Sequence, residues 1–152
     1  MFVGEAPGFN EDKQGKPFVG AAGRFLNQLL GLAGLEREKV FITNIVKCRP
    51  PNNRDPMEDE IEICTSNYLQ SQFQLIKPRL TVALGRIAAG ELLGKLVVMA
   101  KEHGTLHECT YGGVKFRLFV TYHPAAALYG ADAKQKLIED FRKLGKVLKS
   151  II

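Results

Sequence analysis

Short apolar runs that alternate with helical patterns constrain the fold of this chain more than any other feature. One opens the chain as "MFVG", and the others lie at 40–46 ("VFITNIV"), 80–85 ("LTVALG") and 116–124 ("FRLFVTYHP"). Runs of this length and composition are typical of buried strands. Strands that alternate with helices predict an α/β domain with a mainly parallel sheet.

The segments between these runs are predicted to be mostly helical. Residues 25–33 place apolar side chains on one helical stripe, and so do residues 137–151 at the end of the chain. A short helix is expected over 86–94. Residues 96–115 show no clear period, and we expect them to be irregular with an edge hairpin around Gly112–Gly113.

A further helix is predicted to begin at "DPME", residues 55–58. Asp55 is expected to cap it, Pro56 suits the first helical position, and Glu58 can complete a capping box. The helix is expected to end near Lys77–Pro78, because proline cannot continue it. Its expected buried side carries Ile61, Cys64, Tyr68, Phe73 and Ile76.

Length and charge set broad limits on this protein. A chain of 152 residues fits one domain over 1–152, and because it opens directly in a strand we expect it to be shortened at its N-terminus. The net charge of +5 is compatible with a nucleic-acid partner without requiring one. No apolar run approaches the about 20 residues of a membrane span, and residues 1–8 lack a basic signal-peptide start. The expected compartment is the cytoplasm.

Three cysteines, Cys48, Cys64 and Cys109, are too few and odd in number for a disulfide framework. Cys64 and Cys109 fit the role of small buried apolar residues. Cys48 fits it poorly, because it lies between Lys47 and Arg49 in a proline-rich loop. From its surroundings alone, Cys48 is a nucleophile, a metal ligand or a residue without chemical function.

Polar residues follow the apolar runs at the points where the strands are expected to end. These residues are Glu5, Asn44, Arg86 and His123. In parallel α/β sheets the carboxyl ends of the strands lie at one rim, where ligands bind. Taken singly, each residue has a structural explanation, such as a helix cap or a turn. Taken together at one rim, they favour a binding or catalytic site.

The residue types at this rim suit a particular chemistry. An amide pairs with the edge of a base, a carboxylate orients water and stabilises a sugar cation, and a histidine donates a hydrogen bond to an anionic leaving group. Phe18, in the loop "GKPFVG", offers a stacking surface. The structural alternative for Phe18 is a loop anchor in the core.

Five motifs of this sequence resemble the iron–sulfur (family 4) uracil-DNA glycosylases, particularly archaeal members. The motifs are "VGEAPG", "GKPFVGAAG", "ITNIVKCRPPNNRDP", "VALGR" and "TYHPAAAL", and the resemblance runs from residue 1 to about 142. It implies a three-layer α/β/α fold with a central four-stranded parallel sheet. It also implies hydrolysis of the N-glycosidic bond of uracil in DNA, which leaves an abasic site, after the base has left the stack.

The resemblance assigns roles at the pocket. Asn44 would read the uracil edge, Phe18 would stack on the base, and Glu11 would crowd a thymine methyl. His123 would stabilise the departing uracil near O2. Glu5 would orient the attacking water, with backbone groups from Gly4 to Ala6 sharing that role.

The resemblance also implies DNA contacts and a cofactor. Arg54 and Arg86 would lie near phosphates, and Leu128 would enter the duplex. Cys48 and Cys64 match two of the four ligands of a 4Fe-4S cluster, so occupancy of the cluster in this chain is in doubt. The implied partner is uracil-containing DNA, and a sliding clamp or other repair proteins are further expected partners. The protein is expected to be a monomer that does not bind a membrane.

Two other classes of function remain open at this stage. A non-catalytic α/β module that binds nucleotides or DNA would keep the fold, but it would be expected to lose some of Glu5, Phe18, Asn44 and His123. A small electron-transfer protein would use Cys48 and Cys64, and would need thiolates from a partner.

Overall fold

A five-stranded sheet forms the centre of the computed structural model, which describes residues 1–151. The strands lie in the order β2-β1-β3-β5-β4. Four of them are parallel and β4 runs antiparallel to β5 at one edge. The strands are β1 (Phe2–Gly4), β2 (Ile42–Asn44), β3 (Leu80–Leu84), β4 (Thr105–Tyr111) and β5 (Val114–Thr121).

The α/β prediction and the four parallel strands are confirmed, but the strand count was one too low. Strand β4 lies in the segment expected to be irregular. Its sequence is mostly polar, and its side chains alternate between half-buried and exposed, so no apolar run marks it. The hairpin turn at Gly112–Gly113 is confirmed, with positive φ angles of 56° and 80° that favour glycine.

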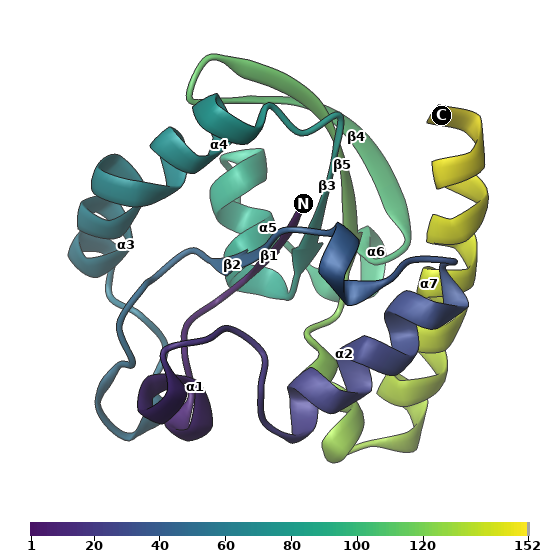
Figure 1. Ribbon diagram of the computed structural model, residues 1–152, viewed down its shortest axis with the longest axis horizontal. Coiled ribbons are helices and arrows are strands. Elements are labelled where there is room, and N and C mark those ends of the chain that lie inside the picture. Colours follow the sequence, from purple (N-terminus) through teal and green to yellow (C-terminus); the bar gives the residue numbers. More distant parts are fainter. Residues whose placement is uncertain (152) are drawn as a thin grey trace.

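Helices cover both faces of the sheet, as Figure 1 shows. Successive strand residues point to opposite faces, so Phe2 and Val82 pack against α2 and α7, whereas Val3 and Ala83 face the other side. The helices are α1 (Phe9–Gln14), α2 (Ala21–Leu32), α3 (Glu58–Cys64), α4 (Gln70–Ile76), α5 (Arg86–Leu93), α6 (Met99–Glu102) and α7 (Ala131–Ile151). The expected three-layer arrangement is therefore present. Within residues 1–151 no helix is long and apolar enough to cross a membrane.

The predicted cap of α3 was wrong. The helix begins at Glu58, and the Glu60 carboxylate accepts a hydrogen bond from the Met57 backbone N–H at 2.8 Å. Asp55 lies before this turn and accepts instead from Arg86 Nη2 at 3.0 Å. The carboxylate that accepts from the backbone N–H before the helix is therefore that of Glu60, whereas Asp55 contacts the first residue of α5.

The helix after Asp55 is also interrupted by a π turn, Thr65–Leu69, between α3 and α4. A π turn shifts the helical register by about one residue. Leu69 and Phe73 are therefore buried, whereas Tyr68 and Ile76 are exposed, contrary to the prediction. The predicted end is confirmed, since Lys77 adopts a left-handed conformation directly after Ile76.

Candidate active site

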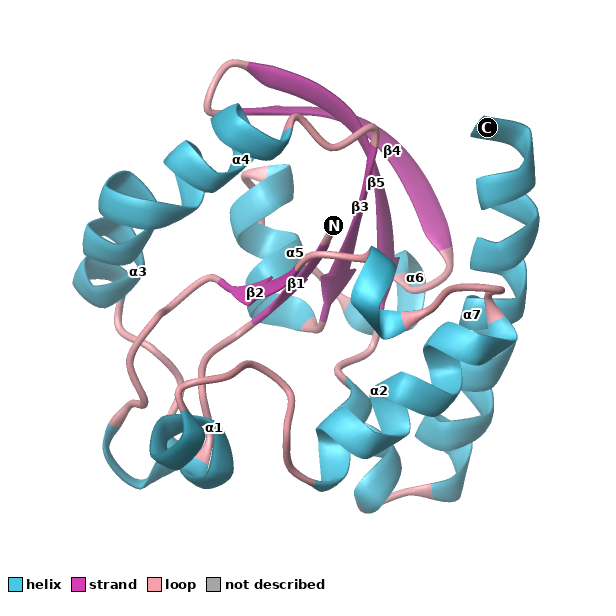
Figure 2. Cartoon of the chain, viewed as in Figure 1, coloured by secondary structure: helices cyan, strands magenta, loops and turns pink. Residues whose placement is uncertain are grey.

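The carboxyl ends of the parallel strands border a cavity of about 370 Å³. The loops that follow β1 and β2 run past α1 at this end of the sheet (Figure 2). The volume lies in the range of small-molecule pockets. Residues predicted from the sequence line it, namely Glu5, Ala6, Glu11, Phe18, Asn44, Arg54 and His123.

Asn44 lines this cavity and carries an unpaired acceptor. Its side chain is 6% exposed, and its Oδ1 atom is buried without a hydrogen-bond partner among the described residues. The backbone around it is fixed: Asn44 pairs with Gly4 across the sheet, and Lys47 Nζ donates to the Asn44 carbonyl at 2.6 Å. A buried acceptor without a partner costs free energy, so Asn44 is set up to accept a hydrogen bond from a ligand.

Gly4 allows two functional side chains to meet. A Cβ atom at Gly4 would lie 2.6 Å from Asn44 Oδ1 and 2.7 Å from Phe18 Cζ. Both distances are too short for carbon in contact with these atoms. The missing side chain at the end of β1 therefore lets the amide and the aromatic ring lie next to each other.

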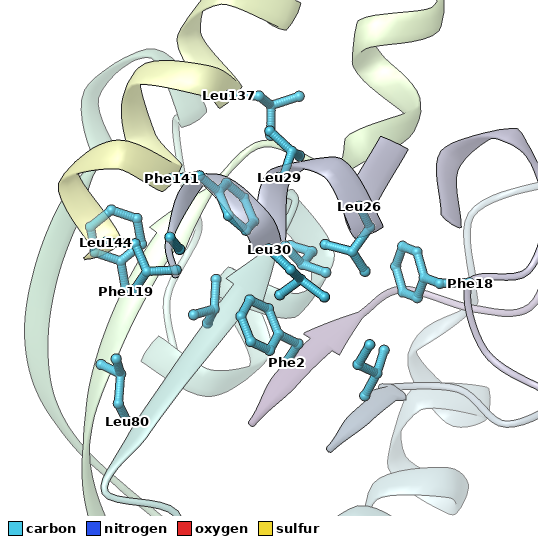
Figure 3. Close-up of a cluster of buried hydrophobic side chains, with 14 residues drawn as sticks. Phe2, Phe18, Leu26, Leu29, Leu30, Leu80, Phe119, Leu137, Phe141 and Leu144 are labelled. Atoms are coloured by element: carbon cyan, nitrogen blue, oxygen red, sulfur yellow. The ribbon is translucent and has the colours of Figure 1, made fainter. Parts of the chain in front are cut away.

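Phe18 belongs to the apolar core and also lines the cavity. Its side chain is 5% exposed and belongs to the apolar cluster on the α2 and α7 face, where it lies next to Leu26 in Figure 3. Its ring also lines the cavity and stacks on the His123 imidazole, with ring centroids 5.3 Å apart. The structure therefore places Phe18 in the core and at the edge of the cavity, and its stacking on a base stays a prediction.

His123 is neutral at physiological pH. Its burial lowers the pKa to about 4, and the nearby Glu11 carboxylate offsets only part of this effect. The Nδ1 atom accepts a hydrogen bond from the Ala125 backbone N–H at 3.1 Å. A neutral imidazole has one N–H, so the proton lies on Nε2 and that nitrogen acts as a donor.

Glu5 is a half-buried carboxyl group with a raised pKa. Its Oε1 atom is buried without a hydrogen-bond partner among residues 1–151. Burial raises the pKa of Glu5 to about 7, and the neighbouring Asp55 adds to the rise while Arg86 opposes it. Glu5, Asp55 and Arg86 also line a smaller cavity of about 180 Å³. The sequence pattern did not point to Asp55 as a neighbour of Glu5.

Glu11 ties the glycine-rich loop together. Its carboxylate accepts hydrogen bonds from the backbone N–H groups of Gly8 at 3.1 Å and of Val19 and Gly20 at 2.9 Å. Burial alone would raise the pKa of Glu11, but these hydrogen bonds outweigh it and lower the pKa. The side chain thereby holds the loop that carries Phe18, and its role against a thymine methyl stays a prediction.

Comparisons with known proteins agree with this geometry. The family model described as the uracil DNA glycosylase superfamily matches residues 1–144. A type-4 uracil-DNA glycosylase of Sulfurisphaera tokodaii is 51% identical over 95% of this chain and 67% of the relative. Type-4 enzymes of Saccharolobus solfataricus and Archaeoglobus fulgidus are 50% and 44% identical, over 99% and 97% of this chain and 71% and 75% of their own lengths.

The chain belongs to the uracil DNA glycosylase superfamily. The similarity to several type-4 members over most of the chain identifies it as a family 4 glycosylase. The resemblance drawn from the five motifs is thereby confirmed.

The cations predicted to contact DNA lie near the cavity of this glycosylase, but both hold acidic partners. Arg54 lines the cavity and donates to both oxygens of Glu60, at 2.7 and 3.2 Å. Arg86 is exposed and pairs with Asp55. Leu128, at the end of the short helix η4 (Pro124–Leu128), has 49% of its surface exposed. A DNA contact at these residues stays a prediction.

The two cysteines that match family ligands do not form a metal site by themselves. Cys48 is exposed on the loop after β2, whereas Cys64 is partly buried at the end of α3. Among residues 1–151 no group of three or more candidate ligands could hold a metal ion. A four-iron, four-sulfur cluster normally needs four thiolates, so the residues present do not fit the cofactor of family 4 glycosylases.

Other site residues of this glycosylase were missed or used differently. The Gly4 and Glu5 carbonyls accept hydrogen bonds from the Ile45 and Val46 N–H groups at 2.9 Å, so both already have a backbone partner just beyond the end of β2. In the sequence Lys47 stands out only as a cation beside Cys48. Its ammonium instead points back toward β2, where it donates to Thr43 Oγ1 at 2.7 Å and to the Asn44 carbonyl.

The lowered pKa of His123 predicts a pH-dependent stability. Between pH 6.5 and 4 the unfolded chain binds a proton at His123 that the folded chain does not, so stability falls as the pH falls through this range. The shift corresponds to about 3 kcal/mol. We expect wild type to lose up to this amount relative to His123→Gln between pH 7 and 4, measured by urea unfolding. Parallel pH curves for the two proteins would contradict the neutral buried imidazole.

Proposed function

We propose that this chain hydrolyses the N-glycosidic bond of uracil in DNA, releasing free uracil and leaving an abasic site. One observation carries the proposal: Asn44, whose Oδ1 atom is buried and unpaired, lines one cavity together with Phe18 and the neutral His123. These are the groups needed to recognise a pyrimidine edge, stack on its face and stabilise its departure.

Asn44 accounts for the choice of base. Uracil presents its N3–H donor beside the O4 acceptor, which matches an amide that offers Oδ1 and Nδ2. Cytosine presents the opposite pattern, an N3 acceptor beside an amino donor. With cytosine the buried Oδ1 would remain unpaired, and an unpaired buried group is what makes such discrimination strong.

The base must leave the stack before it reaches this cavity. We propose that Leu128 enters the duplex as the base leaves, supported by its exposure at the tip of η4 on the segment that follows His123. Arg54 and Arg86 are proposed to contact phosphates. On binding DNA, Arg54 would give up part of its hydrogen bonding with Glu60, and Arg86 part of its hydrogen bonding with Asp55, to bind a phosphate oxygen.

The chemical step uses His123 and Glu5. The bond between C1′ and N1 breaks, and its electron pair leaves with uracil. The Nε2–H of the neutral His123 donates to uracil O2, where negative charge develops. The Glu5 carboxylate stabilises the positive charge on the sugar and orients a water molecule, whose oxygen then bonds to C1′. The proton released from this water passes to Glu5 or to solvent.

A direct assay tests this function. The protein is incubated with a single-stranded oligonucleotide that contains one uracil, and alkali then cleaves the strand at any abasic site. We expect cleavage at the uracil position. We expect Asn44→Asp to reduce the rate by about 10- to 100-fold, because it replaces the amide donor by a carboxylate in a buried site.

Asn67→Asp is the matched control, since Asn67 is exposed on the π turn and the change in charge is the same. No cleavage by a folded wild-type sample would refute the glycosylase proposal and favour a non-catalytic DNA-binding module. Equal rates for Asn44→Asp and Asn67→Asp would refute the edge-reading role.

The raised pKa of Glu5 predicts the pH dependence of the reaction. The reactive form is the carboxylate, so kcat/KM should rise about tenfold per pH unit below pH 7 and level off above it. Asp55→Asn should move this break to lower pH, because Asp55 raises the pKa of Glu5. Measured kcat/KM from pH 5 to 9 would show both effects, and a flat wild-type profile would contradict the role of Glu5.

A cluster on Cys48 and Cys64 would need two further thiolates, and Cys109 does not match a family ligand. The catalytic groups lie elsewhere, so no step of the reaction depends on these thiols. We therefore expect Cys48→Ser and Cys64→Ser to change uracil release by less than about twofold. Iron analysis of this chain should give far less than four iron atoms per molecule. Loss of activity in either variant would show that the thiols support the site.

The remaining expectations from the resemblance stay predictions. These are a monomer that works in the cytoplasm, with a sliding clamp or other repair proteins as further partners.

A further inference from the structure

We propose that Arg37 is a positioning residue for base stacking, which holds the backbone at Pro17–Phe18 so that the Phe18 ring faces the cavity. Arg37 lies in the short helix η1 (Arg37–Lys39), between α2 and β2. The inference rests on the proposed function, because it assigns Arg37 a part in binding the uracil ring.

Arg37 donates hydrogen bonds to two consecutive backbone carbonyl groups in the loop that carries Phe18. Its Nη2 donates to the Pro17 carbonyl at 2.5 Å, and its Nη1 donates to the Phe18 carbonyl at 2.8 Å. Nη1 also donates to Asn27 Oδ1 on α2 at 3.0 Å. The planar fork of a guanidinium suits two adjacent acceptors, which a lysine ammonium cannot span with the same geometry.

The backbone of Phe18 needs such support. Its φ angle of +50° lies in the left-handed region, which is unfavourable for a residue with a side chain. The first turn of α2 also lies very close to this peptide, because a Cβ atom at Gly23 would lie only 1.9 Å from the Phe18 carbonyl oxygen. The Phe18 carbonyl is therefore in close contact with both the backbone of Gly23 and the Arg37 guanidinium.

This backbone position fixes where the ring lies. Figure 3 shows Phe18 at one end of the apolar cluster, next to Leu26. The ring stacks on His123, and it approaches Asn44 over the missing side chain of Gly4. A small displacement of the Phe18 backbone would change the distance from the ring to both recognition groups at once.

Arg37 acts on the base only through Phe18. It does not line the main cavity, whereas it borders a separate surface hollow together with Pro17, Asn27 and Arg24. The alternative role is purely structural, in which Arg37 only ties η1 to the loop. A structural role would lower stability without depending on the Phe18 ring.

A double-mutant cycle separates these roles. Affinity for free uracil is measured by NMR titration for wild type, Arg37→Ala, Phe18→Ala and the double variant, alongside kcat and KM for the uracil oligonucleotide. We expect Arg37→Ala to weaken uracil binding by about tenfold or more, since small misplacements at a site are costly. In the Phe18→Ala background the same change should have little further effect.

Chemical rescue provides an independent readout. Millimolar guanidinium should restore part of the uracil affinity of Arg37→Ala, because it can fill the vacated position between the two carbonyls. Arg37→Lys should stay impaired. Lys39→Ala is the matched control, since Lys39 lies in the same turn, pairs with Glu36 at 3.0 Å and should bind uracil as wild type does.

Several results would overturn the proposal. One is an unchanged uracil affinity in Arg37→Ala. Another is an equal loss of uracil affinity on Arg37→Ala in the wild-type and Phe18→Ala backgrounds, which would indicate a structural role. If Arg37→Ala does not fold, Asn27→Ala and Arg37→Gln replace it in the cycle. Because the cycle measures binding, a wild type that binds uracil without excising it refutes the glycosylase proposal alone, and one that does neither refutes both.

Discussion

The close approach of the Asn44 amide and the Phe18 ring to the backbone of Gly4 is the constraint on which the rest of this site depends. Strand β1 lies between β2 and β3, so its carboxyl end is surrounded by both neighbours. With no side chain at Gly4, the Asn44 amide and the Phe18 ring both reach the space that a Cβ would fill. A methyl group there would separate edge recognition from stacking, although it would leave the sheet pairing of β1 intact.

The cavity holds polar groups whose burial is unfavourable in the absence of a ligand. Asn44 Oδ1 and Glu5 Oε1 are both buried without a partner among the described residues. The free-energy cost of leaving these two oxygens unpaired is offset by the burial of apolar side chains in the clusters on the two faces of the sheet. Lys47, Glu11 and Arg37 hold the surrounding backbone through hydrogen bonds to carbonyl or N–H groups. The unpaired groups thus remain in place for a ligand.

Much of the fold could be predicted because the relevant signals are local. Apolar runs and helical spacing located the parallel strands and the long helices, and polar residues after the runs located the rim. Strand β4 was missed because its residues alternate without an apolar run. The burial of Leu69 in place of Tyr68 was missed because a π turn changes the register, and no residue type marks such a turn.

The sequence by itself determined the alternation of parallel strands and long helices along the chain. It also predicted Glu5, Asn44 and His123 at one rim, because parallel strands end on the same side of a sheet. Only the tertiary structure decided which distant residues act on the groups of this site. Asp55 lies beside Glu5, and Arg37 reaches the Phe18 peptide 19 residues away. Neither contact follows from periodicity, since both depend on the path of irregular loops.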